Sequence, residues 1–308
     1  TRVQGGGSGW RCVRMRVLLT GAGGQLGQAL IASAPDGLEL VATGRSELDL
    51  SNPKACREAV QQHRPDWVLN AGAYTAVDKA ESEPDLAHAV NAGAPEAFAT
   101  VLKQEGGRLL QISTDFVFNG TQGFPYKPDQ KREPLGVYGA SKAAGESAIE
   151  ALFNGDPRAL ILRTSWVIGP VGKNFARTML KLHQERDSLG VVADQVGCPT
   201  STINLAEACW QAIQLGSASE LPQVMHWSDA GAASWYDVSV AVGRISQDLG
   251  LVDEPAKVKP ITTADYPTPA QRPSYSLLDC TSTRAALQLP GEHWEEALRT
   301  VLTQVSST

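Results

Sequence analysis

Short apolar runs alternate with longer amphipathic segments through the first half of the chain. The apolar runs predict buried strands at 16–20, 38–43, 67–71, 108–114 and 159–164. Helical spacing predicts helices at 28–33, 53–63, 85–105, from 141 onward and at 174–184. Asn52 and Pro53 suit the N-cap and first position of the second helix. Strands that alternate with helices in this way predict an α/β fold with a doubly wound parallel sheet of the Rossmann type.

The pattern loosens after about residue 170, where Pro, Gly and polar turns are more frequent and the elements look short. We therefore predict a dinucleotide-binding domain over residues 15–170. Residues 171–308 are expected to form mainly a smaller substrate domain, partly interleaved with the sheet. Residues 1–14 contain no apolar signal core and are expected to be a disordered extension.

Composition excludes several classes of partner. The net charge of -6 over 308 residues gives no electrostatic reason to expect nucleic acid. No apolar run approaches the length of a membrane span. The cysteines are scattered without a C-x-x-C pair, which indicates reduced thiols and a cytoplasmic protein. They are Cys12, Cys56, Cys198, Cys209 and Cys280.

A glycine-rich loop follows the first predicted strand. Gly21, Gly24 and Gly27 form G-x-x-G-x-x-G around Gln25 and Leu26. The first glycines permit a tight turn and close approach of a pyrophosphate to backbone N–H groups, and the last permits the helix to pack on the strand. With a strand before it and a helix after it, the loop predicts a dinucleotide site.

The second strand bears on which dinucleotide binds. NAD enzymes usually place an acid at its end, but here Arg45 follows and could pair with a 2′-phosphate. NADPH is therefore favoured, NADH stays possible, and a solvated loop arginine is the alternative interpretation. Asp49 and Leu50 are expected near the adenine, and Ala73, Tyr74 and Thr75 beside the nicotinamide.

Tyr138 and Lys142 carry the candidate chemistry. Four residues apart, they lie on one face of a helix, so both heads can reach one pocket. An ammonium beside a phenol favours the phenolate, so we expect the pKa of Tyr138 to be lowered towards neutrality. Tyr138 is then a candidate proton donor to a carbonyl under reduction. Thr114 stands at the carboxyl end of a predicted strand, where ligands gather in such sheets.

Together these segments resemble the dTDP-4-dehydrorhamnose reductases, which belong to the extended short-chain dehydrogenases/reductases. The resemblance runs from Met15 to the C-terminus and rests on motifs at 20–27, 70–78, 113–118, 138–142, 163–167, 194–200 and 272–279. It implies reduction of dTDP-6-deoxy-L-lyxo-4-hexulose to dTDP-L-rhamnose with hydride from NADPH.

The resemblance also implies roles for residues. Tyr138 would protonate the oxygen, Lys142 would hold the cofactor ribose, and Thr114 would bond the carbonyl oxygen. Asp115 and Trp166 would contact the sugar. From the residues themselves, Asn174 is a further candidate for a substrate contact, and Arg272 is the best basic candidate for the diphosphate, because a guanidinium fork suits phosphate. Trp166 could instead be a core residue, Asn174 a helix cap and Arg272 part of a surface ion pair. The acidic residues Asp78, Glu81, Glu83 and Asp85 are expected to form a solvated face.

Two departures from the family pattern limit what carries over. Phe116 stands where the family often has Tyr, and Ala29 stands where some members place a carboxylate for Mg²⁺ between subunits. Mg²⁺ is therefore possible only through ligands that the sequence does not identify, no metal ligand is assigned, and both monomer and homodimer stay open. Two other functions also stay open: a related nucleotide-sugar epimerase or dehydratase, and a non-catalytic dinucleotide-binding subunit like that of methionine adenosyltransferase.

Overall fold

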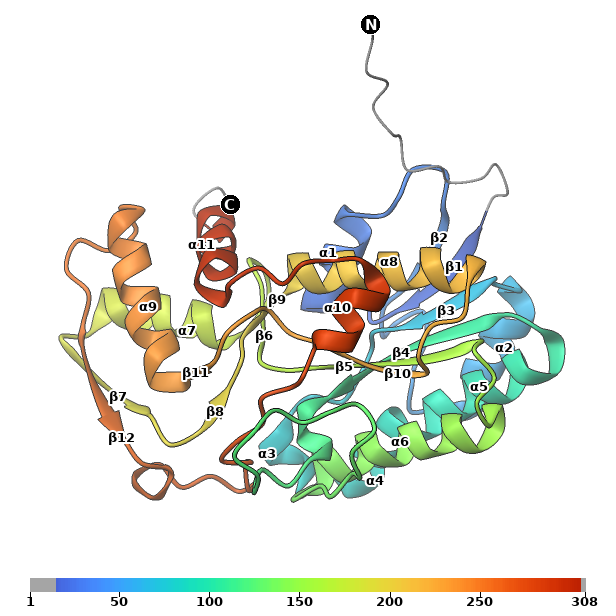
Figure 1. The fold of residues 1–308 in the computed structure, drawn as a ribbon, viewed down its shortest axis with the longest axis horizontal. Coiled ribbons are helices and arrows are strands. Elements are labelled where there is room, and N and C mark those ends of the chain that lie inside the picture. Colours follow the sequence, from blue (N-terminus) through green and yellow to red (C-terminus); the bar gives the residue numbers. More distant parts are fainter. Residues whose placement is uncertain (1–14, 306–308) are drawn as a thin grey trace, which may run out of the picture.

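A six-stranded parallel sheet forms the centre of the computed structural model, which describes residues 15–305 (Figure 1). The strand order is β10-β5-β4-β3-β1-β2. The strands are β1 (Arg16–Thr20), β2 (Glu39–Thr43), β3 (Trp67–Asn70), β4 (Arg108–Thr114), β5 (Ala159–Thr164) and β10 (Val224–Trp227). From β1 the chain first adds β2 on one side and then β3, β4 and β5 on the other, so the direction of the strand order reverses between β1 and β3. In such sheets ligands bind at this point, beyond the carboxyl ends of the strands. The predicted doubly wound sheet is confirmed.

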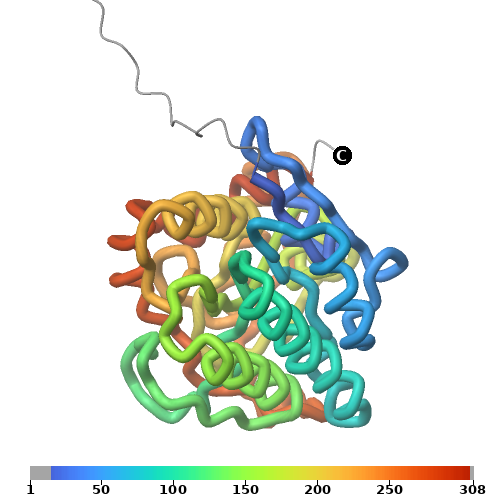
Figure 2. The backbone as a smooth tube through the Cα atoms, turned by 90° about the vertical axis from the view of Figure 1, so that its right-hand side faces the viewer, coloured from blue at the N-terminus to red at the C-terminus, as the bar shows by residue number. Residues whose placement is uncertain are grey.

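Helices cover both faces of the sheet. α1 (Gln25–Ala32) and α8 (Thr202–Ala218) pack on one face. α2 (Pro53–His63), α5 (Ala94–Glu105) and α6 (Val137–Phe153) pack on the other, and Figure 2 shows the two helical layers from the side. Each layer has its own apolar core, because residues of a buried strand point alternately to the two faces: Leu19 and Leu69 on one, Leu18 and Val68 on the other.

Two helix starts differ from the sequence prediction. α1 begins at Gln25 instead of 28, and α6 begins at Val137 instead of 141, so Tyr138 lies in the first turn of its helix. In both cases an extended glycine, Gly24 or Gly136, comes immediately before the helix. The predicted cap of α2 is confirmed, since the Asn52 side chain accepts hydrogen bonds from the N–H groups of Lys54 and Ala55, both at 3.1 Å.

The connection after β3 contains α3 (Val77–Ala80), α4 (Pro84–His88) and a π-helical turn at Ala89–Gly93 that continues into α5. The predicted helix at 85–105 is therefore one run with a π-bulge inside it. Bulges of this kind often mark functional sites.

The second half of the chain builds a separate layer and returns to the sheet once, between α7 and α9. β10 pairs with β5 at the edge of the sheet, and α8 covers the sheet. A third core lies among α7 (Phe175–Glu185), α9 (Trp235–Asp248) and α11 (Trp294–Val305). Short paired strands border it: β6 (Val167–Ile168) with β9 (Thr200–Ser201), β7 (Ser188–Val192) with β12 (Lys257–Ile261), and β8 (Val196–Gly197) with β11 (Ala233–Ser234). α10 (Thr281–Leu287) packs near β10.

The expectation of short elements after residue 170 is wrong for α8 and α9, which have 17 and 14 residues. The side chains of Ser201 and Ser234 cap their amino ends, a signal that a polar turn hides when it is read only as a loop. No helix within residues 15–305 is long and apolar enough to cross a bilayer. The predicted extension at 1–14 lies outside the described residues.

Candidate active site

The glycine loop between β1 and α1 leaves no room for side chains at its turning points. Gly21 has φ of +69°, and a Cβ there would lie 2.6 Å from the Gly72 Cα. A Cβ on Gly27 would collide with the Gly21 carbonyl group. Gly24 caps α1 without a side-chain hydrogen bond to its first N–H groups. The loop therefore presents backbone N–H groups and a helix amino end beside the point where β1 and β3 diverge, which suits a pyrophosphate.

The next two loop residues point in different directions. The Leu26 side chain is buried in the core under α1, so only its backbone faces the loop. The Gln25 side chain reaches α7, where its Oε1 accepts a 2.8 Å hydrogen bond from Asn174 Nδ2. Asn174 also caps α7, accepting from the Arg177 N–H at 3.1 Å. Of the two roles foreseen for Asn174, the structure contains the cap, together with a link to the glycine loop.

Two charged side chains, Arg45 and Glu47, lie near the end of β2, and the carboxylate was not expected there. Arg45 is exposed, as a group facing a bound phosphate would be. The chain then folds back, and Glu47 Oε2 accepts a 2.8 Å hydrogen bond from the Gly44 N–H. A carboxylate therefore does reach the end of β2, although none occupies the adjacent sequence positions. Asp49 caps a turn by accepting from the Ser51 N–H, and Leu50 packs beside Gly72.

The segment Ala73 to Thr75 follows β3 and is fixed by a residue that sequence reasoning missed. Asn91, in the π-helical turn, accepts from the Tyr74 N–H at 2.9 Å and donates to the Tyr74 carbonyl at 3.0 Å. Asn91 Nδ2 also donates to Ser141 Oγ at 3.0 Å. The buried amide thus joins the loop after β3 to the helix that carries Tyr138 and Lys142. A polar residue inside an apolar helical stretch was the only signal available.

Tyr138 and Lys142 both meet the last residues of β4, Tyr138 at Thr114 and Lys142 at Ile112. The Thr114 hydroxyl interacts with the Tyr138 phenol and donates to Asp115 Oδ1 at 3.1 Å. The Phe116 ring packs edge-on against the Tyr138 ring, with centroids 5.4 Å apart. α6 approaches this closely because Gly139 faces the Phe116 carbonyl, where a Cβ would not fit.

The expected effect of Lys142 on Tyr138 is corrected by the geometry. Lys142 is only 4% exposed, and its Nζ donates a 2.6 Å hydrogen bond to the Ile112 carbonyl. Burial, with a smaller effect of the Asp115 charge, raises the pKa of Tyr138 to about 12, so the phenol is not shifted towards neutrality. Burial lowers the pKa of Lys142 to about 8, against the opposing charge of Glu146. As predicted, the spacing of four residues places the Tyr138 and Lys142 side chains on one face of α6. The Lys142 ammonium, however, is hydrogen-bonded to β4 and not to the phenol.

Asp115 is buried beside the same cluster. Burial raises its pKa to about 6, an effect that the nearby Ser276 and Thr114 hydroxyls partly offset. Its Oδ2 accepts no hydrogen bond from the described part of the chain. A buried acceptor without a partner is costly unless a ligand satisfies it.

Trp166 combines packing with an unusual backbone. Its ring stacks on Trp235 at a centroid separation of 3.6 Å, so one face belongs to the third core, as the core interpretation expected. Its φ is +47°, in the left-handed region that bulky residues avoid. Strained conformations of this kind tend to occur at functional sites.

Arg272 forms an ion pair with Asp78, as the alternative interpretation of this residue expected. Its two terminal nitrogens each lie 2.9 Å from an oxygen of Asp78. The acidic cluster is therefore not simply a solvated face. Glu81 accepts from the Val137 N–H at 2.9 Å and so holds the start of α6, while Glu83 accepts from the Tyr74 hydroxyl at 2.6 Å.

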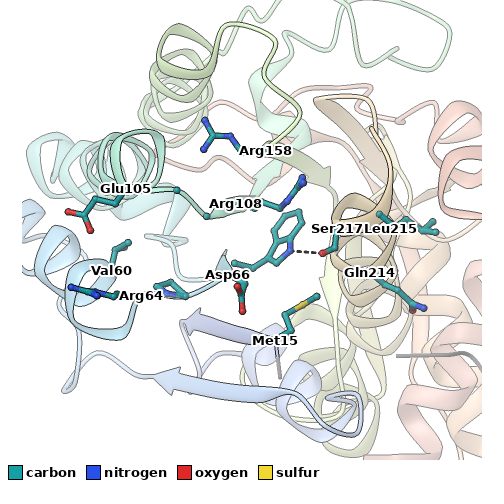
Figure 3. Close-up of a pocket in the computed structure, with 15 residues that line it drawn as sticks. Met15, Val60, Arg64, Asp66, Glu105, Arg108, Arg158, Gln214, Leu215 and Ser217 are labelled. Carbon is teal, nitrogen blue, oxygen red and sulfur yellow. Dashed lines mark hydrogen bonds between the residues drawn. The ribbon is translucent and has the colours of Figure 1, made fainter. Parts of the chain in front are cut away.

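A separate hollow lies at the end of the sheet opposite to the glycine loop, where the strands begin (Figure 3). It encloses about 900 Å³ and is lined by residues at the amino ends of β3 and β4, including Asp66 and Arg108. None of the predicted site residues lines it. Ligands of doubly wound sheets bind at the carboxyl ends, so we place the candidate site at the glycine loop and Tyr138 and not in this hollow.

No group of three or more His, Cys, Asp or Glu side chains among residues 15–305 is arranged to hold a metal ion. Cys56, Cys198, Cys209 and Cys280 are buried free thiols, and Cys12 lies outside the described residues.

Comparisons with known proteins show the family. A family model described as RmlD substrate binding domain matches residues 15–307. The dTDP-4-dehydrorhamnose reductase of Streptomyces griseus is 40% identical over 287 residues, covering 92% of each chain. That of Salmonella typhimurium is 38% identical over 299 residues, covering 96% of this chain and 99% of the relative.

Solved structures give the same result. A dTDP-4-dehydrorhamnose reductase from Clostridium acetobutylicum is 35% identical with a TM-score of 0.86. One from Bacillus anthracis, in complex with NADP, is 32% identical with a TM-score of 0.86. Both matches cover 95% of this chain and 100% of the other. The chain therefore belongs to the RmlD substrate binding domain family, the family of the dTDP-4-dehydrorhamnose reductases.

Proposed function

We propose that the protein reduces dTDP-6-deoxy-L-lyxo-4-hexulose, also called dTDP-4-dehydrorhamnose, to dTDP-L-rhamnose with NADPH, the last step of dTDP-rhamnose synthesis. The observation that carries the proposal is the meeting of Thr114, Tyr138 and Lys142 at the carboxyl edge of the sheet that also bears the glycine loop. Membership of the family supplies the substrate class.

The residues present fit a dinucleotide. Gly21 and Gly27 allow the close backbone packing of the loop, and Gly24 caps α1, so backbone N–H groups at the start of α1 would face a pyrophosphate. Arg45 would face a 2′-phosphate, with Asp49 and Leu50 towards the adenine. Ala73, Tyr74 and Thr75 would line the nicotinamide, and Lys142 would hold its ribose. When bound, NADPH supplies the hydride, and NADH is the alternative donor.

Tyr138 acts in this proposal as a general acid. A pKa of about 12 keeps its hydroxyl protonated at neutral pH, so it can transfer a proton to the substrate O4 as hydride arrives at C4. Reduction needs no lowered pKa, because the phenol starts as the acid. The Thr114 hydroxyl orients the carbonyl oxygen and bonds to the phenol that gives up the proton.

Other residues would hold the sugar. The unpartnered Oδ2 of Asp115 is available to accept from a substrate hydroxyl, and the strained backbone of Trp166 supports a contact with the sugar ring. Asn174 would contribute through the N-cap that it forms on α7 and through its hydrogen bond to Gln25. Contact of Arg272 with the diphosphate requires the guanidinium to exchange Asp78 for phosphate oxygens, which suit the same planar fork.

The decisive experiment follows NADPH oxidation with saturating dTDP-4-dehydrorhamnose. We expect Tyr138→Phe to lower kcat by about 10² to 10⁴, the usual scale for a general acid. Tyr236→Phe, on α9, is the matched control and should match the wild type. Equal, slow rates for wild type and Tyr138→Phe would refute the assignment.

A second substrate is favoured by one observation. A Streptomyces antibioticus relative named as a probable dTDP-4,6-dihydroxy-2-methyloxan-3-one 4-ketoreductase is 38% identical over 287 residues. Reduction of another dTDP-linked 4-ketosugar would use the same residues. The ratio of kcat/KM for the two ketosugars decides between them.

The remaining alternatives predict different behaviour of the purified protein. An epimerase or dehydratase would keep tightly bound nicotinamide, because it returns the hydride to its substrate. A non-catalytic subunit would bind dinucleotide and lose nothing on Tyr138→Phe. Stoichiometric cofactor after purification would support the first alternative, and a synthetase partner in a pull-down the second.

A further inference from the structure

A buried cluster of charged side chains lies behind the reacting groups. Glu146 is on α6, one turn beyond Lys142, and is 1% exposed. Arg163, on β5 and 2% exposed, donates to it from Nε at 2.9 Å and from Nη2 at 2.6 Å. Arg132, from the loop before α6, donates at 2.9 Å. The mechanism above uses none of these three residues.

The same carboxylate also joins α6 to the end of β4. Ser113 Oγ donates to Glu146 Oε1 at 2.5 Å. Its neighbour Ile112 accepts from Lys142, and its other neighbour Thr114 meets Tyr138. Three consecutive strand residues thus meet three helix residues spaced by four, which is the spacing of one helix face.

Stability alone is a poor reason for this arrangement. Burying a carboxylate and a guanidinium costs several kcal/mol per ion, and well-packed apolar residues often do as well or better. What an ion pair offers beyond apolar packing is a fixed geometry and a fixed charge. Hydrogen bonds from Arg163, Ser113 and Arg132 hold the pKa of Glu146 below its usual value despite burial, so its charge is permanent.

That charge acts on Lys142. Glu146 opposes the lowering of the Lys142 pKa by burial. The other charged or titratable groups around the cluster are Tyr138, Asp115, Arg132 and its partner Glu150, Arg163 on β5, and His226 on β10. His226 has its Nε2 3.2 Å from Arg163 Nη1 and stays neutral, because burial lowers its pKa to about 3.

We propose that Glu146, clamped by Arg163, is a positioning residue that fixes the register of α6 on β4 and supplies the counter-charge to the Lys142 ammonium. The inference rests on the proposed function, in which Lys142 holds the cofactor ribose. It predicts that the carboxylate is needed for reduction and for cofactor binding at alkaline pH, although it touches neither substrate nor cofactor.

The test is Glu146→Gln, which keeps the shape and removes the charge. We expect kcat to fall by about 10- to 100-fold, because small misplacements of reacting groups cost rate steeply. Wild-type activity and NADPH affinity should decline as pH rises through about 8, where Lys142 loses its proton. In Glu146→Gln this alkaline limb should move to lower pH by about one unit, because an attracting charge is gone.

Glu150→Gln is the matched control. Glu150 lies one turn further along α6 and also binds Arg132, at 2.7 Å, but is not bonded to β4. The activity and NADPH affinity of Glu150→Gln should decline over the same alkaline pH range as those of the wild type. The proposal would be overturned by a folded Glu146→Gln variant whose kcat and alkaline pH dependence both match the wild type. A residue with a structural role alone would change only the melting temperature.

If Glu146→Gln does not fold, Ser113→Ala decides the question. It removes the strand's bond to the carboxylate and leaves the ion pair, so we expect a folded enzyme with kcat several-fold lower. A wild-type kcat would refute the register role. NADPH binding, followed by fluorescence against pH, separates this test from the proposed function: the shift of the binding limb stays measurable even if the ketosugar proves to be a different one.

Discussion

At the scale of single residues, Arg45 and Glu47 bring opposite charges to the end of β2, where the adenosine ribose is expected. Arg45→Ala should raise the KM for NADPH about tenfold, the cost of about 1.4 kcal/mol for one lost charge-assisted contact. The KM for NADH should change little, because NADH has no 2′-phosphate. Glu47→Gln should lower the KM for NADPH by removing a repelling carboxylate.

Steady-state kinetics with both cofactors measure this prediction. Arg57→Ala, which removes an exposed arginine from α2, serves as the control for a general change in surface charge. If Arg45→Ala raises both KM values equally, Arg45 does not recognise the phosphate and is the solvated loop residue that the sequence left open.

The positions of the candidate catalytic residues could be predicted from sequence because they depend on spacing that a regular helix or a strand end preserves. Tyr138 and Lys142 needed only an intact helix, and Thr114 only the end of β4. Glu47 and Asn91 could not be found in this way, because a turn and a π-bulge bring them to their partners. The pKa of Tyr138 was mispredicted because spacing does not show that Lys142 bonds to a backbone carbonyl instead.

At the scale of elements, α6 must approach the π-helical turn closely to set the site. A Cβ on Gly145 would collide with the Asn91 carbonyl. Gly145→Ala should therefore lower the free energy of unfolding by about 1–3 kcal/mol, the usual cost of overpacking. It should also lower kcat, because Asn91 bonds to both Tyr74 and Ser141.

Urea unfolding of Gly145→Ala beside Gly93→Ala checks this expectation. Gly93 lies in the π-helical turn with a helical φ of -64°, and a Cβ there would meet only Pro53, at an ordinary 3.8 Å. That control should be neutral or stabilised by up to about 1 kcal/mol. Equal effects of the two substitutions would mean that the close approach at Gly145 is not needed.

β1, β3, β4 and β5 were predictable because each is an apolar run that is buried almost throughout. β10 was not predicted. The starts of α1 and α6 were less predictable, because Gly24 and Gly136 cap these helices and have no side chain by which a cap could be identified. The length of α8 and α9 was missed because their first residues follow serine-containing turns that also suit loops.

At the scale of the whole molecule, distant segments share one structure in ways that local patterns do not contain. β10 joins the sheet beside β5 after a separation of sixty residues in the numbering, and α8 packs against α1. Interleaving was predicted in outline, but no local pattern indicated which segment would return. No local pattern indicated the hollow at the amino ends of the strands, because residues far apart in the sequence, from α2, β3, β4 and α8, line it together.

The Asp78–Arg272 ion pair joins α3 to the segment before α10 and makes the role of Arg272 testable. Both side chains are partly exposed, so the pair should contribute only about 1 kcal/mol and less at high salt. If Arg272 exchanges Asp78 for the substrate diphosphate, Asp78→Asn should lower the KM for the dTDP-sugar, because the guanidinium no longer has to leave a carboxylate. Arg272→Met should raise that KM by about tenfold or more. A purely structural pair predicts that both substitutions lower the melting temperature alike and leave KM unchanged, so measuring KM and melting temperature for the two variants separates the roles.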